Sequence, residues 1–150
     1  MPRLDAERVA LLRALTAATT AVSRQIDAEL SAEFDLPLAW FEVMTALQRA
    51  GGTLRVNELR ASLDEIASSL SRRLDRMEEA GYIAREAAAH SSQSAADRRA
   101  VSVTLTRNGR SLWRDANIAY RRAVQRHFND VVTDSDVVAL QRFVSKLGRG

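Results

Sequence analysis

IASSLSRRLDRMEEAG, residues 66–81, is the stretch on which the interpretation of the whole sequence depends. Its large apolar residues recur at intervals of four, four and three, which places them along one side of an α-helix: Ile66, Leu70, Leu74 and Met77. The opposite side carries two hydroxyls and three guanidiniums, from Ser68, Ser69, Arg72, Arg73 and Arg76. Gly81 follows the pattern at the position where a left-handed helix cap favours glycine. The stretch predicts a helix that packs on a core and presents arginine and serine outward.

A helix of this kind has the width that fits the major groove of DNA. Arginine suits that position because its planar guanidinium makes paired hydrogen bonds with phosphates and with guanine. The ordinary alternative is a solvated amphipathic helix, since Asp75, Glu78 and Glu79 lie in the same stretch and it is not uniformly basic. The choice between the two interpretations depends on the surrounding sequence.

The composition fits one small helical domain, or a domain with an oligomerisation extension. The chain has 150 residues, of which 46% are hydrophobic and only 5% aromatic, so we expect a core of leucine, valine, isoleucine and alanine. The net charge is 22 minus 19, or +3, and every basic residue except Lys146 is arginine. Arginine favours phosphate binding, although a GC-rich genome also encodes arginine- and alanine-rich proteins.

Several classes of protein are excluded or disfavoured. The sequence has no cysteine, which excludes disulfides, thiolate metal sites and thiol redox sensing. Its N-terminal residues do not form a secretion signal and no apolar run is long enough to span a bilayer, so we expect a cytoplasmic protein that does not enter the membrane. The two histidines, His90 and His127, are not accompanied by a glycine-framed serine or by a metal-binding cluster. We therefore expect no enzyme activity, no metal and no cofactor.

The first half of the chain predicts helices of unequal length. Residues 5–34 form one long helix, whose apolar side we expect to pack partly against a second copy of the chain: Leu11, Leu15, Val22, Ile26 and Leu30. A second helix follows Pro37 and runs to about residue 50, with these residues directed inward: Phe41, Met44, Ala46 and Leu47. Residues 53–55 are a strand stub, and residues 56–62 give one or two helical turns.

The middle of the chain predicts a winged helix-turn-helix. A short helix, a turn at 63–65 and the helix at 66–80 have the order of a helix-turn-helix, and the second helix begins either with Asp64 as its N-cap or with a capping box from Ser62 and Glu65. Residues 82–87 and 100–105 are expected to pair as a hairpin around a loop at 88–96. The tip of this hairpin, or wing, carries Asp97, Arg98 and Arg99.

The last part of the chain predicts two more helices. Thr106 is an N-cap candidate for a helix over residues 108–131, and Thr133 with Asp134 caps the final helix. Four apolar residues of the final helix recur at three, four and three, which resembles a heptad seam: Val137, Leu140, Val144 and Leu147. We expect this seam to pack with the first and fifth helices.

Two motifs in the right order resemble the MarR (multiple-antibiotic-resistance regulator) family of transcription factors. They are LSRRLDRMEEAGYI, residues 70–83, and DRRAVSVTLTRNGR, residues 97–110. The resemblance extends over nearly the whole chain. It implies a mainly α fold with a small β-hairpin wing, in which a winged helix-turn-helix is flanked by N- and C-terminal dimerisation helices. It also implies a helical dimerisation region over residues 1–34 and 107–150 and a DNA-binding region over 35–106.

The resemblance further implies a homodimer that binds a pseudo-palindromic double-stranded DNA operator, most simply as a ligand-responsive repressor. The helix would enter the major groove, and its contacts would come from Ser68, Ser69, Arg72, Arg73 and Arg76. The wing would reach the minor groove with Arg98 and Arg99, and Asp97 would support the wing. A small aromatic or anionic effector would bind near Trp40, Phe41 and either Arg13 or Arg24, and the alternative is that these two rings are ordinary core residues and the arginines are solvated. The alternative is a nucleoid-type or protein-binding winged-helix module without operator specificity.

Overall fold

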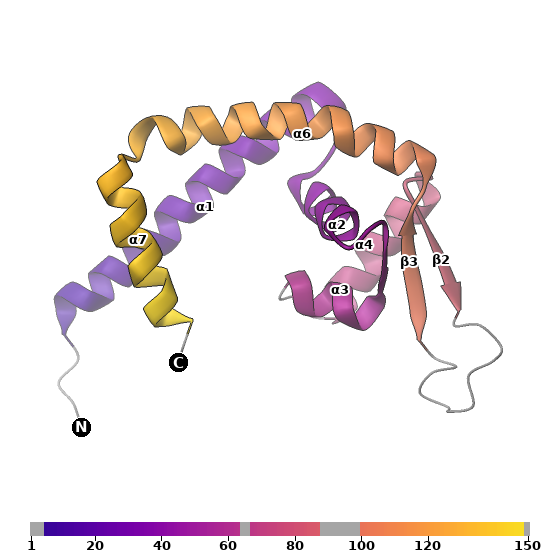
Figure 1. Cartoon of the computed structure of the whole chain (residues 1–150). Helices are drawn as coiled ribbons and strands as arrows, with labels where there is room; N and C mark the ends of the chain where they lie inside the picture. The colour runs from indigo at the N-terminus through magenta and orange to yellow at the C-terminus, as the bar shows by residue number, and fades with distance from the viewer. Residues whose placement is uncertain (1–4, 64–66, 88–99, 149–150) are drawn as a thin grey trace.

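The computed structural model describes residues 5–63, 67–87 and 100–148, in which two long helices, α1 and α6, lie over a smaller winged unit (Figure 1). The elements in chain order are α1 (Ala6–Phe34), α2 (Leu38–Arg49), β1 (Thr53–Arg55), α3 (Val56–Leu63), α4 (Ala67–Glu79), β2 (Ile83–Ala87), β3 (Val101–Leu105), α6 (Arg107–His127), the 3-10 turn η1 (Asn129–Val131) and α7 (Asp134–Leu147). This order confirms the predicted fold class.

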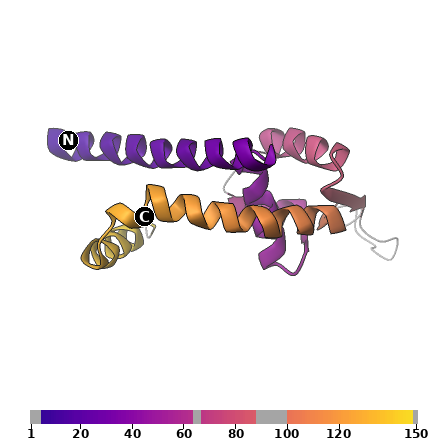
Figure 2. The same cartoon turned by 90° about the horizontal axis from the view of Figure 1, so that it is seen from above.

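Helix α1 is long because both of its ends are capped and no residue within it interrupts the backbone ladder. The Asp5 carboxylate accepts a hydrogen bond from the Glu7 amide, and Asp35 ends the helix in the left-handed conformation, with φ 52°. Ile26 and Leu30 are buried, whereas Leu11 is 53% exposed. Only the C-terminal half of the predicted apolar side is therefore covered within this chain, where α1 packs against α6 (Figures 1 and 2).

The three strands form one antiparallel sheet in the order β1-β3-β2. The predicted hairpin is confirmed, with Ile83 opposite Leu105 and Ala87 opposite Val101. The strand stub also belongs to this sheet, because Thr53 pairs with Thr104 across the other edge of β3. Residues 88–99, which include the predicted loop and the tip of the wing, lie outside the described residues.

Helix α4 follows the predicted pattern. Leu70, Leu74 and Met77 are at most 1% exposed and belong to one core, together with residues from α1, α2, α3, β2, β3 and α6. Gly81 ends the helix with φ +82°, and the next amide, from Tyr82, donates to the Met77 carbonyl at 3.1 Å. Ile66 and both N-cap alternatives that involve Asp64 and Glu65 lie outside the described residues.

The two C-terminal helices differ in how far they meet the predictions. Thr106 caps α6 by accepting a hydrogen bond from the Gly109 amide at 3.0 Å, as predicted, but α6 ends at His127 and η1 follows it. Thr133 and Asp136 form a capping box at the start of α7. None of the helices in the described part of the chain combines the length and apolar composition that a membrane crossing requires.

The prediction that the α7 seam packs with the first and fifth helices is wrong for this single chain. Its residues are 38–62% exposed: Val137, Leu140, Val144 and Leu147. The backbone leaves helical geometry at Phe128, with φ −130° and ψ −60°, and the turn η1 directs α7 away from the axis of α6 (Figure 1). In the view from above, α7 also lies apart from α1 (Figure 2). The seam is therefore an uncovered apolar side of the protein.

Candidate nucleic-acid interface

The outer side of α4 brings together most of the side chains that the sequence predicted to meet DNA. Ser69, Arg72 and Arg76 are exposed, and Arg73 is half-buried at the border of the core. These four residues line one shallow hollow, whose other wall is the start of α2 with Pro37, Ala39 and Trp40. Nothing is described of the Ser68 side chain. The geometry gives one cationic surface with a hydroxyl on it, which is the chemistry that phosphate oxygens and base edges require.

The core fixes the direction in which this surface faces. Leu70, Leu74 and Met77 occupy the opposite side of α4 and are fully buried, so α4 cannot rotate about its axis without exposing them. At the border of the hollow, the Trp40 ring meets the Tyr82 ring edge-on, with centroids 6.3 Å apart and planes at 68°. The arginines of α4 are thus carried on a rigid element.

Two of the three acidic residues of α4, Asp75 and Glu78, are paired with an arginine of the wing, and Glu79 is exposed. Asp75 and Glu78 both accept hydrogen bonds from Arg85 in β2, at 2.6 Å and 3.2 Å. The hydrogen bonds from Arg85 lower the pKa of Glu78, and the two carboxylates raise the pKa of Arg85. This arrangement was not predicted from the sequence, where the only signal for it is the spacing of three residues between Asp75 and Glu78.

The wing residues Asp97, Arg98 and Arg99 lie outside the described residues, so their contacts remain predictions. The structure does describe β2 and β3, the two strands that precede and follow these residues in the chain. Strands β2 and β3 are paired from Ile83–Leu105 to Ala87–Val101, and Arg85 lies opposite Val103 in the middle of that register. The hairpin leaves the core beside α4 (Figure 1).

The four residues predicted to bind an effector do not line one pocket. Phe41 is a core residue, 2% exposed, whose ring centroid lies 4.7 Å from that of Tyr120, and it lines a pocket between α2, α3 and α6. Trp40 lines the hollow beside α4, and Arg13 is exposed on α1. Arg24 lines a different pocket, between α1, α2 and the end of α3.

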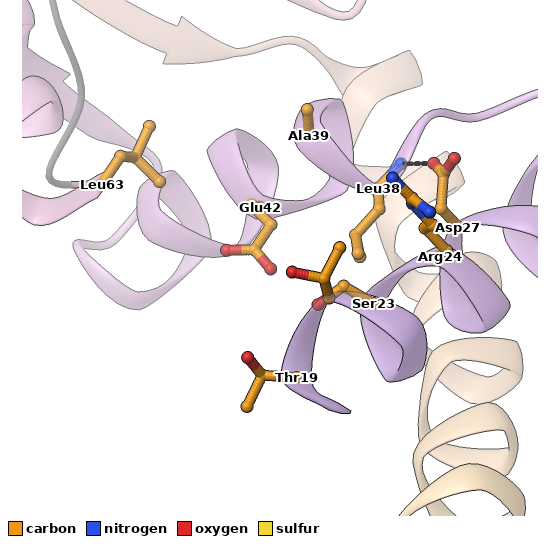
Figure 3. A pocket seen from close by; sticks show the side chains of 9 residues that line it. Thr19, Ser23, Arg24, Asp27, Leu38, Ala39, Glu42 and Leu63 are labelled. Atoms are coloured by element: carbon orange, nitrogen blue, oxygen red, sulfur yellow. Dashed lines mark hydrogen bonds between the residues drawn. The ribbon is translucent and has the colours of Figure 1, made fainter. Parts of the chain in front are cut away.

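The pocket at Arg24 is polar on its α1 side (Figure 3). Thr19, Ser23 and Asp27 face it from α1, and Glu42 faces it from α2. Asp27 is committed to a structural role, because its carboxylate accepts a hydrogen bond from the Leu38 amide at 2.7 Å and so caps the first turn of α2. Two carboxylates beside a single arginine make this pocket unfavourable for an anion.

A second pocket, which was not predicted from the sequence, lies between α2, α3 and α6. Its walls carry Trp113 and Tyr120 from α6, together with two guanidiniums, from Arg49 and Arg121, and one carboxylate, from Glu42. The Trp113 indole donates to the Thr45 hydroxyl at 3.0 Å, which ties α6 to α2 across the pocket. Burial raises the pKa of Tyr120, so its phenol is neutral at physiological pH. Rings and guanidiniums in one hollow suit a planar anion.

His127 has a structural partner and belongs to no metal-binding group among residues 5–63, 67–87 and 100–148. Its ring nitrogen lies 2.5 Å from the carboxylate of Glu29 on α1, and the same carboxylate accepts from Arg126 at 2.9 Å. The hydrogen bond to His127 is the largest of the effects that lower the pKa of Glu29. These contacts link α1 to α6 at the end of α6.

Residues 34–100 match the MarR family. Among solved structures, Sco3205, a MarR family transcriptional regulator from Streptomyces coelicolor in complex with DNA, is 24% identical, with 100% of this chain and 91% of that chain covered and a TM-score of 0.86. A mutant MarR from E. coli complexed with operator DNA is 23% identical, with 97% and 98% covered and a TM-score of 0.79.

A third solved structure, Bordetella bronchiseptica BpsR, concerns regulation of DNA binding by 6-hydroxynicotinic acid. It is 21% identical, with 92% of this chain and 98% of that chain covered and a TM-score of 0.76. No curated protein matches the chain. At such identities the likeness to solved structures establishes the fold, which is the same over nearly the full length of all three.

Proposed function

We propose that this chain, whose residues 34–100 match the MarR family and whose fold is that of MarR-type structures, is a sequence-specific DNA-binding transcriptional regulator. The observation that carries the proposal is the α4 surface, on which Ser69, Arg72, Arg73 and Arg76 gather while the opposite side of the helix is buried. Two proteins of the same fold, Sco3205 and MarR, were solved with DNA. Helix α4 is the element with the right side chains to enter a major groove.

The active form that we propose is a homodimer. The N-terminal half of α1 and the whole of α7 leave large apolar side chains uncovered within one chain, among them Leu11, Leu12, Val144 and Leu147. A second copy related by a twofold axis covers such surfaces with equivalent ones. Residues 1–34 and 107–150 then form the dimerisation region, and residues 35–106 form the DNA-binding region.

A symmetric dimer sets the form of the target. Two copies of α4 reading successive turns of one DNA face lie about 34–36 Å apart, so the target is a pseudo-palindromic operator. Ser68, Ser69 and the α4 arginines read the major groove, where one good bidentate contact discriminates by about 1–3 kcal/mol. Arg98 and Arg99 of the wing contact the backbone and the minor groove, where Arg99 responds to groove width.

Control by a small effector is the second part of the proposal. DNA binding by BpsR, which shares the fold, is regulated by 6-hydroxynicotinic acid. In this chain, the pocket between α2, α3 and α6 combines Trp113 and Tyr120 with Arg49 and Arg121, and it lies between the long helix α6 and the winged unit. A planar aromatic anion bound there alters the angle between α6 and the winged unit and so releases DNA.

The protein that we propose acts in the cytoplasm as a repressor.

DNA binding is tested by fluorescence anisotropy with two labelled duplexes of equal length, one from the intergenic DNA beside the gene and one of random sequence. We expect at least ~10³-fold preference for the first at fixed salt, and steep weakening of both as salt rises. Arg72→Ala with Arg76→Ala should weaken binding to both duplexes and make the salt slope shallower by about one for each phosphate interaction removed. Arg114→Ala, at an exposed site on α6, is the matched control.

Two outcomes contradict the proposal. Equal affinity for the two duplexes indicates the non-specific nucleoid-type alternative, and no binding to either indicates a protein-binding winged helix. Effector control is tested separately by tryptophan fluorescence with 6-hydroxynicotinate as the probe. If Arg121→Ala and Trp113→Phe leave its binding unchanged, the pocket assignment is wrong.

A further inference from the structure

Arg85 connects the wing to α4 through both its side chain and its backbone. Its guanidinium donates from Nη2 to Asp75 Oδ1 at 2.6 Å and to Glu78 Oε1 at 3.2 Å. Its backbone amide donates to the other oxygen of Glu78, Oε2, at 2.8 Å. In the strand, Arg85 lies opposite Val103 of β3. One residue is thus fixed to the helix by three hydrogen bonds and lies within the paired hairpin.

The backbone between α4 and β2 is held at the link itself, by hydrogen bonds from Tyr82 to Met77 and from Thr106 to the link, and Arg85 adds contacts further along the strand. The link consists of Ala80, Gly81 and Tyr82, and Gly81 adopts φ +82°, a conformation that glycine accepts easily. Arg85 lies four residues beyond Gly81, so its bonds act at a distance from the link and restrain the angle between helix and strand. The Arg85 side chain is 25% exposed, whereas its partners Asp75 and Glu78 are 56% and 39% exposed, so we expect these bonds to orient the strand rather than to add much stability.

The restrained side of α4 adjoins the proposed DNA surface. Successive helical residues are rotated by about 100°, so Asp75, three residues after Arg72, lies about 60° from it around the helix, and Glu78 lies about 60° further toward the core. The bonds to Arg85 therefore hold the base of the wing next to the arginine surface. They also compensate two carboxylates that would otherwise repel phosphate from that side.

We propose that Arg85 is a positioning residue for DNA binding, which holds the β2–β3 hairpin against α4 through Asp75 and Glu78 so that wing and helix meet one DNA duplex together. The inference rests on the proposed function. It adds a residue that does not itself need to contact DNA, and it assigns a role to Asp75 and Glu78.

The test is anisotropy on the full-length protein with the duplex that the wild type prefers. We expect Arg85→Ala to raise the Kd at least about tenfold, the scale of one groove interaction, while circular dichroism and Tm stay close to the wild type. Arg85→Lys should recover part of the affinity, because lysine can reach one carboxylate but lacks the planar fork. Arg114→Ala again serves as the matched control, with unchanged affinity expected.

A double-mutant cycle separates positioning from other roles. If Arg85 acts by placing the wing, its substitution costs less in an Arg99→Ala background than in the wild type, because the wing of that background no longer binds the minor groove. A second background removes the charges: Asp75→Asn and Glu78→Gln together with Arg85→Ala should bind as weakly as Arg85→Ala alone. Recovery of wild-type affinity in that triple variant means that Arg85 only compensates charge, and overturns the proposal.

The remaining outcomes are equally decisive. Wild-type affinity in a folded Arg85→Ala variant overturns the inference and leaves the proposed function intact. If the wild type binds no duplex, the proposed function fails. Should Arg85→Ala fail to fold, Arg85→Lys decides in its place: weaker binding by the folded variant supports the proposal, and wild-type binding overturns it.

Discussion

Gly109, in the first turn of α6, occupies a position where one added methyl group should destabilise the protein. A Cβ built on Gly109 lies 2.1 Å from the carbonyl oxygen of Tyr82 and 3.1 Å from Cδ2 of Leu105. The first turn of α6 is also tied to the α4–β2 link: Thr106 donates from its amide to the Tyr82 carbonyl at 3.1 Å and from its hydroxyl to the Gly81 carbonyl at 2.6 Å. Gly109→Ala must therefore move one backbone segment away from another.

Two effects of opposite sign compete in this variant. Alanine is favoured over glycine inside a helix by about 0.8–1.0 kcal/mol. Against this, real Cβ contacts almost never fall below 3.0 Å, so the 2.1 Å approach demands a shift of about 0.9 Å, and overpacking of this kind costs about 1–3 kcal/mol. The same shift weakens the Thr106–Tyr82 hydrogen bond, which is worth about 1 kcal/mol. The steric effect should prevail, with a net loss of roughly 1–3 kcal/mol.

Thermal unfolding followed by circular dichroism measures this loss. For a chain of this length, Tm should fall by about 2–4 °C for each kcal/mol, and the scans must be made at one protomer concentration because dimerisation contributes to Tm. Gly148→Ala is the matched control, since Gly148 has φ −73° and its Cβ would meet only the Val144 carbonyl oxygen, at an ordinary 3.6 Å. A Gly109→Ala protein with a Tm equal to or above that of the wild type would refute the reasoning.

Three further variants test other parts of the structure. Leu74→Ala, at a side chain 1% exposed, should cost about 2–5 kcal/mol in urea unfolding, and a loss below about 1 kcal/mol would argue against its place in the core. The hydrogen bond from His127 lowers the pKa of Glu29, so the stability that Glu29 contributes is present above its ordinary pKa and is lost as pH falls through the lowered pKa. Glu29→Gln should therefore flatten this part of the curve of stability against pH. A curve identical to that of the wild type would contradict this prediction. Arg99→Ala should weaken operator binding severely while the dimer stays folded, so wild-type affinity would count against the wing assignment.

The parts of the fold that local chemistry specifies could be predicted from the sequence. The α4 stripe of Leu70, Leu74 and Met77 and the cap at Gly81 depend on spacing and on one backbone conformation, and both were confirmed. Thr106 was likewise identified because N-capping requires only a hydroxyl one residue before the helix. Such features involve residues within two helical turns of each other.

Features that depend on contacts across the chain could not be predicted. The spacing of Val137 and Leu140 shows that one side of α7 needs a cover, but it does not show which surface supplies it, and the predicted packing with the first and fifth helices is not found within one chain. The α2–α6 pocket is joined by Thr45 and Trp113, which lie 68 residues apart. The role of Arg85 depends on the direction that the chain takes after Gly81, for which the sequence has no periodic signal.

The decisive measurement is selection of bound duplexes from a random DNA library by the purified protein, followed by alignment of the enriched sequences. A twofold dimer that reads DNA through α4 should enrich an inverted repeat with half-site centres about 10 bp apart, one helical turn. An enriched pool without an inverted repeat, or no enrichment above the starting library, would contradict a symmetric dimer that reads sequence through this helix.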